Sequence, residues 1–140
     1  TCNISLAIAK ELAAAVEARA AEMGVKAVVC VSDAGGHPVL VHSMDGAYLA
    51  SYDIAVSKAY TVVALKMSTE ALSHLAQPGQ PLYGIQFTND GKIVIFGGGE
   101  PLERNGKVIG GLGVSGGTAE QDTALAAFGK NKFKEIISWQ

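Results

Sequence analysis

The sequence contains few residues of the kinds that build disulfide frameworks or metal sites. Its two cysteines, Cys2 and Cys30, match no disulfide pattern and no zinc-binding spacing. Its three histidines, His37, His42 and His74, include no His-x-x-His pair, and none accompanies a nucleophilic serine motif. These absences argue against a disulfide-rich secreted domain, a structural zinc site and a hydrolase triad. We therefore expect no metal ion held by the protein's own side chains.

Charge is also sparse and almost balanced. Eleven Lys and Arg face thirteen Asp and Glu, which gives a formal net charge of -2. A nucleic-acid-binding domain usually shows a basic excess, so we expect no nucleic-acid partner. No apolar run reaches the roughly 20 residues of a membrane span. No basic region precedes an apolar segment near the start, as a signal peptide would require. We expect a cytoplasmic protein without a membrane partner.

Apolar residues and glycine are the abundant components. Hydrophobic residues make up 49% of the 140 positions, which predicts a folded chain and a single domain over residues 1–140. Seventeen glycines are present, and most of them follow residue 78. Apolar runs continue through this Gly-rich half, so it is no linker. Glycine at this density indicates strands, tight turns and close approaches between backbones.

Sequence periodicity predicts helices around a set of short strands. Helices are expected at residues 4–23, 49–66 and 68–75, and from Thr118 onward, where Thr118 and Gln121 fit a capping box. Strands are expected at residues 26–32, 37–44, 85–88, 93–96, 101–104 and 108–115, joined by turn signals such as 33–36 and 89–91. The interpretation is an α/β (α+β) fold of order α-β-β-α-α-β-β-β-α. About five antiparallel strands would be covered by the helices.

Lys58 interrupts the apolar stripe of the helix expected at residues 49–66. A buried ammonium is costly without a partner. The candidate carboxylates lie in turns or at a helix start: Asp33, Asp45 and Asp122. Two hypotheses stay open, a structural or solvent-reaching lysine and an anion-recognising lysine on a pocket floor. A third uses Lys58 with Asp33 or Asp122 for proton transfer.

The turn Gly116-Gly117-Thr118 joins a strand to the last helix. Free N–H groups and the helix dipole suit such a turn to a carboxylate or phosphate, although glycine there also serves the turn alone. Near the central loop, Tyr83 is a candidate aromatic wall, and Phe87 is expected in the core. His74 is a candidate at the entrance of the same pocket.

An ordered set of motifs over nearly the whole chain resembles the family of GlcG, HbpS and the PduO C-terminal domain. The segments that carry the resemblance are residues 33–37, 44–47, 51–61, 77–84, 97–101 and 108–122. The sequence also resembles the small OrfY-type members, which are encoded near B12-dependent glycerol or diol dehydratases. The resemblance implies a profilin-like fold, a homo-oligomer that is often an octamer, and a partner role in a B12-dependent enzyme system.

The same resemblance implies a ligand, because family members have been linked to haem or corrinoid binding. One branch is fused to a cobalamin adenosyltransferase domain, which this sequence does not resemble. The haem-binding members place a His ligand on the first helix, whereas residues 4–23 here contain no His. We therefore expect haem binding that is weaker than theirs, or none. The leading hypothesis is an accessory protein that binds haem, a corrinoid or a small organic anion; the alternatives are an oligomeric scaffold and a small enzyme.

Overall fold

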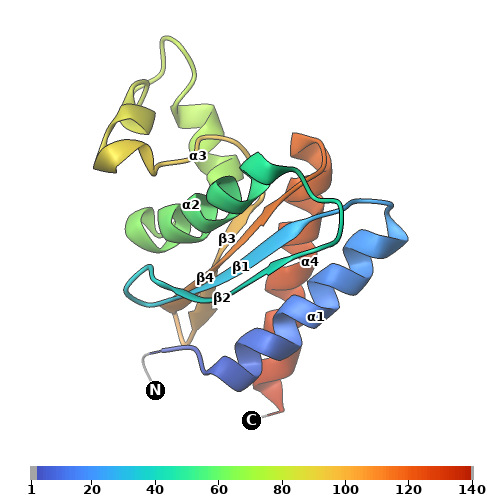
Figure 1. Ribbon diagram of the computed structural model, residues 1–140. Helices are drawn as coiled ribbons and strands as arrows, with labels where there is room; N and C mark the ends of the chain where they lie inside the picture. The colour runs from blue at the N-terminus through green and yellow to red at the C-terminus, as the bar shows by residue number, and fades with distance from the viewer. Residues whose placement is uncertain (1–2, 140) are drawn as a thin grey trace.

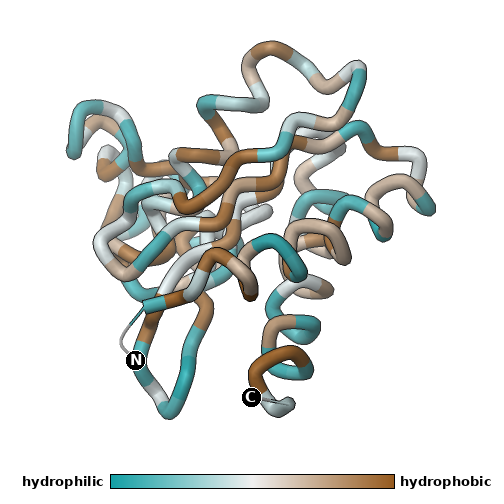
Figure 2. The backbone as a smooth tube through the Cα atoms, turned by 60° about the horizontal axis from the view of Figure 1, so that its bottom comes forward, coloured by the Kyte–Doolittle hydropathy of each residue, from teal (hydrophilic) through white to brown (hydrophobic). Residues whose placement is uncertain are grey.

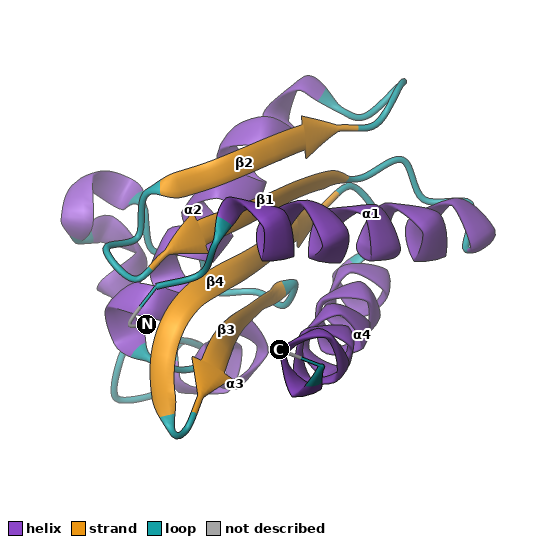
Figure 3. Cartoon of the chain, turned by 90° about the horizontal axis from the view of Figure 1, so that it is seen from below, coloured by secondary structure: helices purple, strands orange, loops and turns teal. Residues whose placement is uncertain are grey.

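A computed structural model describes residues 3–139, and its elements form three layers (Figures 1 and 3). The middle layer is a four-stranded antiparallel sheet of order β2-β1-β4-β3. Its strands are β1 (Val28–Asp33), β2 (Pro38–Ser43), β3 (Gly99–Arg104) and β4 (Lys107–Ser115). On one face lie α1 (Leu6–Glu22) and α4 (Ala119–Ser138); on the other lies α2 (Leu49–Leu65), with α3 (Thr69–Leu75) beside it.

Three of the α-helices, α1, α3 and α4, begin where a short polar side chain satisfies a free N–H group, whereas α2 has no side-chain cap. Ser5 accepts a hydrogen bond from Ile8 N at the start of α1, and Ser68 accepts one from Ala71 N at the start of α3. Thr118 and Gln121 form the expected capping box of α4. The mixed α/β class expected from the sequence is therefore confirmed, with helix bounds close to those predicted.

The central strand β1 is buried on both faces. Val29 and Val31 belong to the main core against α1 and α4, whereas Val28 and Cys30 pack on the α2 side. This explains why the strand reads as a continuous apolar run rather than an alternating one. Figure 2 shows hydrophobic stretches through the central strands and hydrophilic residues at outer turns. Burial raises the pKa of the Cys30 thiol to about 12, so it remains protonated; Cys2 lies outside the described residues.

Glycines on β4 allow α2 to lie directly on the sheet. A Cβ built on Gly111 would come within 2.5 Å of Ala59 O, and one on Gly113 would overlap Ala55 O. Larger side chains at these positions would hold the helix away from the strand. The Gly-rich half thus provides the close backbone approach expected from composition.

The strands predicted at residues 85–88 and 93–96 are wrong, and the sheet has four strands instead of about five. Two short 3-10 helices, η1 (Ile85–Phe87) and η2 (Asn89–Gly91), replace the first. In the segment 93–96, where the other strand was predicted, Val94 N donates to Thr61 Oγ1 of α2. The same hydroxyl donates to Lys92 O at 3.1 Å. A side chain of α2 therefore satisfies backbone groups that a neighbouring strand would otherwise bind.

Residues 76–92 form a lobe that projects beside α3 (Figure 1). The lobe turns at Gly84, which has a φ of 102°, and Asp90 also adopts a left-handed conformation. Phe87 is 77% exposed there, so its expected place in the core is wrong. Leu82, Tyr83 and Phe87 of this lobe are exposed to solvent in the single chain.

Candidate functional site

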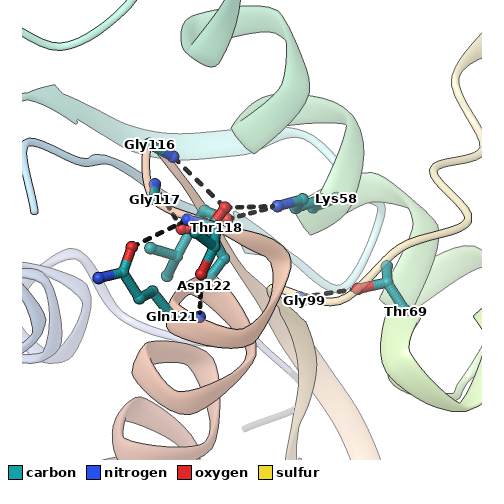
Figure 4. Close-up of polar contacts among 9 residues, drawn as sticks. Lys58, Thr69, Gly99, Gly116, Gly117, Thr118, Gln121 and Asp122 are labelled. Carbon is teal, nitrogen blue, oxygen red and sulfur yellow. Dashed lines mark hydrogen bonds and ion pairs between the residues drawn. The ribbon is translucent and has the colours of Figure 1, made fainter.

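Lys58 and Asp122 form a buried ion pair between α2 and the start of α4 (Figure 4). The Lys58 side chain is fully buried, and its Nζ donates to Val114 O at 2.7 Å and lies 3.4 Å from Asp122 Oδ2. Of the three carboxylates that the sequence offered, Asp122 is the partner. The pair ties the sheet-facing side of α2 to the strand-to-helix turn.

Asp122 also occupies the turn that the sequence marked as an anion site. Its Oδ1 accepts from Gly117 N at 2.9 Å, and its Oδ2 accepts a longer bond, 3.4 Å, from Gly116 N (Figure 4). The N–H of Thr118 donates to Gln121 Oε1 within the capping box. The chain's own carboxylate therefore takes the position that a bound carboxylate or phosphate would need.

The Lys58 side chain is closely surrounded by other groups. Burial lowers the pKa of its ammonium, and the nearby Asp122 carboxylate partly opposes that shift. The Phe96 ring centre lies 5.2 Å from Nζ, within cation–π range. A Cβ on Gly98, whose φ is 123°, would come within 2.5 Å of Nζ. This packing supports the structural ion pair more than a lysine that contacts a ligand or transfers a proton.

Phe96 lines two cavities. One, of about 250 Å3, is lined by Asp122, Ile54 and Tyr48 among others. The other, of about 480 Å3, lies between α3 and the first turns of α4. Sequence reasoning missed Phe96 because residues 93–96 were interpreted as a strand. The glycine run directly after it was the available signal that this segment is irregular.

The remaining candidates from the sequence do not join the Lys58 pair. Asp33 lies at the other end of the sheet, where it pairs with Gly110, and its Oδ1 accepts from the N–H groups of Gly35 and His37. Tyr83 is 55% exposed on the lobe. His74 is exposed on α3, with its Nε2 2.7 Å from Glu70 Oε2. The structure thus brings together Lys58, Asp122 and the Gly116–Thr118 turn only.

Each histidine of the described residues lies beside a carboxylate. His42 Nδ1 is 2.6 Å from Glu17 Oε2 of α1, and His37 Nδ1 is 3.6 Å from Asp33. Between residues 3 and 139, no three His, Cys, Asp or Glu side chains gather closely enough to hold a metal ion. Over the same residues, no helix has the length and apolar character needed to cross a bilayer.

These observations define the class of the protein: a three-layer α/β domain with cavities at one end of its sheet. Residues 4–130 match the family model described as haem degrading protein HbpS-like. The chain therefore belongs to the HbpS-like family. An uncharacterized 15.0 kDa protein from the dhaT-dhaS intergenic region of Citrobacter freundii is 50% identical over 134 residues, which cover 96% of this chain and 94% of that protein.

Other relatives extend this similarity to named proteins. The corrinoid adenosyltransferase PduO of Salmonella typhimurium is 48% identical over 113 residues, 81% of this chain, but the match spans only 33% of PduO. The crystal structure of Klebsiella pneumoniae ORFY superposes with a TM-score of 0.91 at 47% identity and covers 94% of this chain and 90% of ORFY. A PduOC–haem complex superposes with a TM-score of 0.88 at 41% identity. The match covers 92% of this chain and 94% of the PduOC chain.

Proposed function

We propose that this protein is a small-molecule-binding accessory protein whose ligand is a tetrapyrrole, either haem or a corrinoid. The observation that carries the proposal is the match over nearly the full chain to the PduOC–haem complex, with 41% identity and a TM-score of 0.88. The similarity to part of a corrinoid adenosyltransferase keeps corrinoids among the candidates. The closed Lys58–Asp122 network gives less support to a small organic anion as ligand.

The described residues offer one imidazole next to α1. The helix itself, Leu6–Glu22, contains no His, Cys, Met or Tyr that could ligate iron. His42 of β2 is exposed, and its Nδ1 contacts Glu17 of α1, which leaves Nε2 for a metal. A carboxylate partner fixes the tautomer of an imidazole and raises its basicity as a ligand. His42 is therefore the residue that we propose as axial ligand of a bound haem.

Haem titration followed by absorbance tests this proposal. We expect a saturable shift of the Soret band in the wild-type protein, because haem iron changes its spectrum when an imidazole binds. The His42→Ala variant should lose the shift or bind about tenfold more weakly. The His37→Ala and His74→Ala variants are the controls and should bind as the wild type does. They alter imidazoles that are 82% and 73% exposed, against 46% for His42.

If His42→Ala binds haem as the wild type does, and His37→Ala or His74→Ala loses the Soret shift instead, then that other histidine is the axial ligand. A parallel titration with a corrinoid decides between the two tetrapyrroles. The protein would be assigned to whichever ligand saturates at the lower concentration. If neither one gives a saturable change, the proposal is wrong.

A second candidate function is that of an oligomeric scaffold in a B12-dependent enzyme system in the cytoplasm. It is favoured by exposed apolar side chains at the start of α2. Leu49 is 95% exposed, Tyr48 74% and Tyr52 50%, and together they form what we call the α2 patch. Patches of this kind mark protein–protein contacts more often than free surface. The two functions are compatible, since a homo-oligomer could carry a tetrapyrrole on each chain.

A further inference from the structure

The larger cavity is separate from the Lys58 pair and from His42, and we call it the α3–α4 cleft. It measures about 480 Å3, a size typical of small-molecule sites. Figure 1 shows α3 and the N-terminal end of α4 at the same end of the molecule. Apolar side chains of Ile95, Phe96, Ala124 and Ala127 contribute to its lining. The cleft therefore suits a ligand with a small apolar body.

The charged groups of the cleft are all acidic. Its lining includes Glu70 and Glu120 but no Lys, Arg or His. Two neutral lining residues bond to the backbone of α3, since Ser73 Oγ donates to Glu70 O and Gln77 Nε2 donates to Ser73 O. Glu120 stands in the first turn of α4, where it offsets the positive end of the helix dipole.

Nearby cations already have partners. The Lys58 ammonium lies 5.2 Å from the centre of the Phe96 ring and is paired with Asp122. Lys130 lies 3.6 Å from Glu100. Burial raises the pKa of Glu100, and Glu70 also raises it, although Lys130 acts in the opposite direction. Glu70 thus adds negative potential to this wall of the protein. Its Oε2 lies 2.7 Å from His74 Nε2, so a ligand ammonium would share this carboxylate with His74. The residues that line the cleft carry no positive charge of their own.

We propose that the α3–α4 cleft binds a small cationic ligand that joins an apolar or aromatic body to an ammonium group. The body would pack against Phe96 and the alanines of α4, and the ammonium would lie at the rim beside Glu70 and Glu120. Carboxylate-bearing molecules of the same shape would be disfavoured by the two glutamates. This site is independent of the tetrapyrrole site, so the failure of either proposal leaves the other standing.

Two probes of matched shape and opposite charge test the proposal on the full chain. Phenethylamine and phenylacetate would be titrated separately into 15N-labelled protein, with chemical shifts recorded. We expect the amine to shift the signals of Phe96, Thr123 and Ala124 and to bind at least about fivefold more tightly than the acid, since two partly exposed ion pairs are worth this much. Equal or tighter binding of phenylacetate would overturn the charge assignment.

Variants place the bound amine. Glu70→Gln and Glu120→Gln should each weaken amine binding about two- to fivefold, because each removes one ion pair. Glu11→Gln changes an exposed glutamate of α1 and is the matched control that should leave binding unchanged. Ala124→Trp should abolish binding by filling the cleft while keeping an exposed α4 position folded, as circular dichroism would verify. Binding that survives Ala124→Trp, or no amine binding at all, would refute the site.

Discussion

At the scale of single residues, the two partners of the buried pair are not equivalent. Asp122 accepts from Gly116 N and Gly117 N as well as facing Lys58. Among residues 3–139, the only other hydrogen-bond acceptor of Lys58 Nζ is Val114 O. Removing the lysine therefore leaves a carboxylate that keeps two donors. Removing the aspartate leaves a fully buried ammonium without its counter-charge and two N–H groups without their acceptor.

The first prediction follows from that asymmetry. Asp122→Ala should lower the free energy of unfolding by about 3–5 kcal/mol, the usual cost of breaking a buried pair. Lys58→Met fills a similar volume and should cost only about 1–2 kcal/mol. Urea denaturation of both variants measures the difference. A larger loss in Lys58→Met than in Asp122→Ala would contradict this account of the pair.

The pH dependence of Asp122→Ala supplies a check with a defined sign. Burial already lowers the pKa of Lys58, and Asp122 opposes that shift, so the variant should have a still lower Lys58 pKa. Between that value and the ordinary 10.5, the unfolded chain binds a proton that the folded chain has lost. The wild type gains stability in the same way only above its own, higher Lys58 pKa. Stability of the variant relative to wild type should therefore recover as pH rises from the variant's Lys58 pKa to that of the wild type, both of which lie below 10.5. A constant difference over this range would argue against a stranded ammonium.

The burial of Lys58 could be predicted from its place in an apolar helical stripe, but its partner could not be selected. Asp33, Asp45 and Asp122 were equivalent in the sequence, because each follows or begins a turn. The choice depends on strand register, which pairs Asp33 with Gly110 and places Lys58 at Val114, further along the same strand. Phe96 was missed for a similar reason, since its position depends on an irregular segment packed on α2.

At the scale of elements, the contact of α2 with β4 is set by the absence of side chains. A Cβ on Gly113 would overlap Ala55 O and come within 2.7 Å of Ala59 N, both of them backbone atoms of α2. Gly113→Ala should destabilise the protein by about 3 kcal/mol or more, because the helix must move to admit the methyl group. Thermal or urea unfolding measures this loss.

Gly24→Ala is the control for that substitution. Gly24 has a φ of 73° and nothing within 4 Å of a built Cβ, so only backbone strain of about 1 kcal/mol should appear. If the two variants lose equal stability, the close approach of α2 to β4 does not limit the packing.

The elements that the sequence predicted well carry strong local signals. The capping box of α4, the helix expected at residues 68–75 and the turn at residues 33–36 all lie where expected. The apolar run at residues 93–96 carried only one weak signal, the glycines that follow it. Its own residues gave none, because burial beside a neighbouring strand and burial against Thr61 of α2 favour the same residue types. Its conformation depends on the tertiary hydrogen bond from Val94 N to Thr61 Oγ1, which no local sequence pattern encodes.

At the scale of the whole molecule, we expect a homo-oligomer in which the α2 patch is covered. Light scattering at micromolar concentration should return a multiple of the 14.4 kDa chain. Leu49→Asp should dissociate the assembly, because it places a charge in the centre of the patch. Trp139→Asp changes a side chain that is 86% exposed outside the patch, and it should leave the assembly intact. A 14.4 kDa monomer in the wild type would contradict the expectation.

The most direct test of the central claim is a stoichiometric titration of the wild-type protein with haem and, separately, with a corrinoid, alongside PduOC. The account predicts a saturable spectral change that reaches about one tetrapyrrole per chain, with haem binding weaker than in PduOC because α1 carries no His, Cys or Met. If neither ligand gives a saturable change with this protein, while PduOC binds haem in the same assay, the account is contradicted.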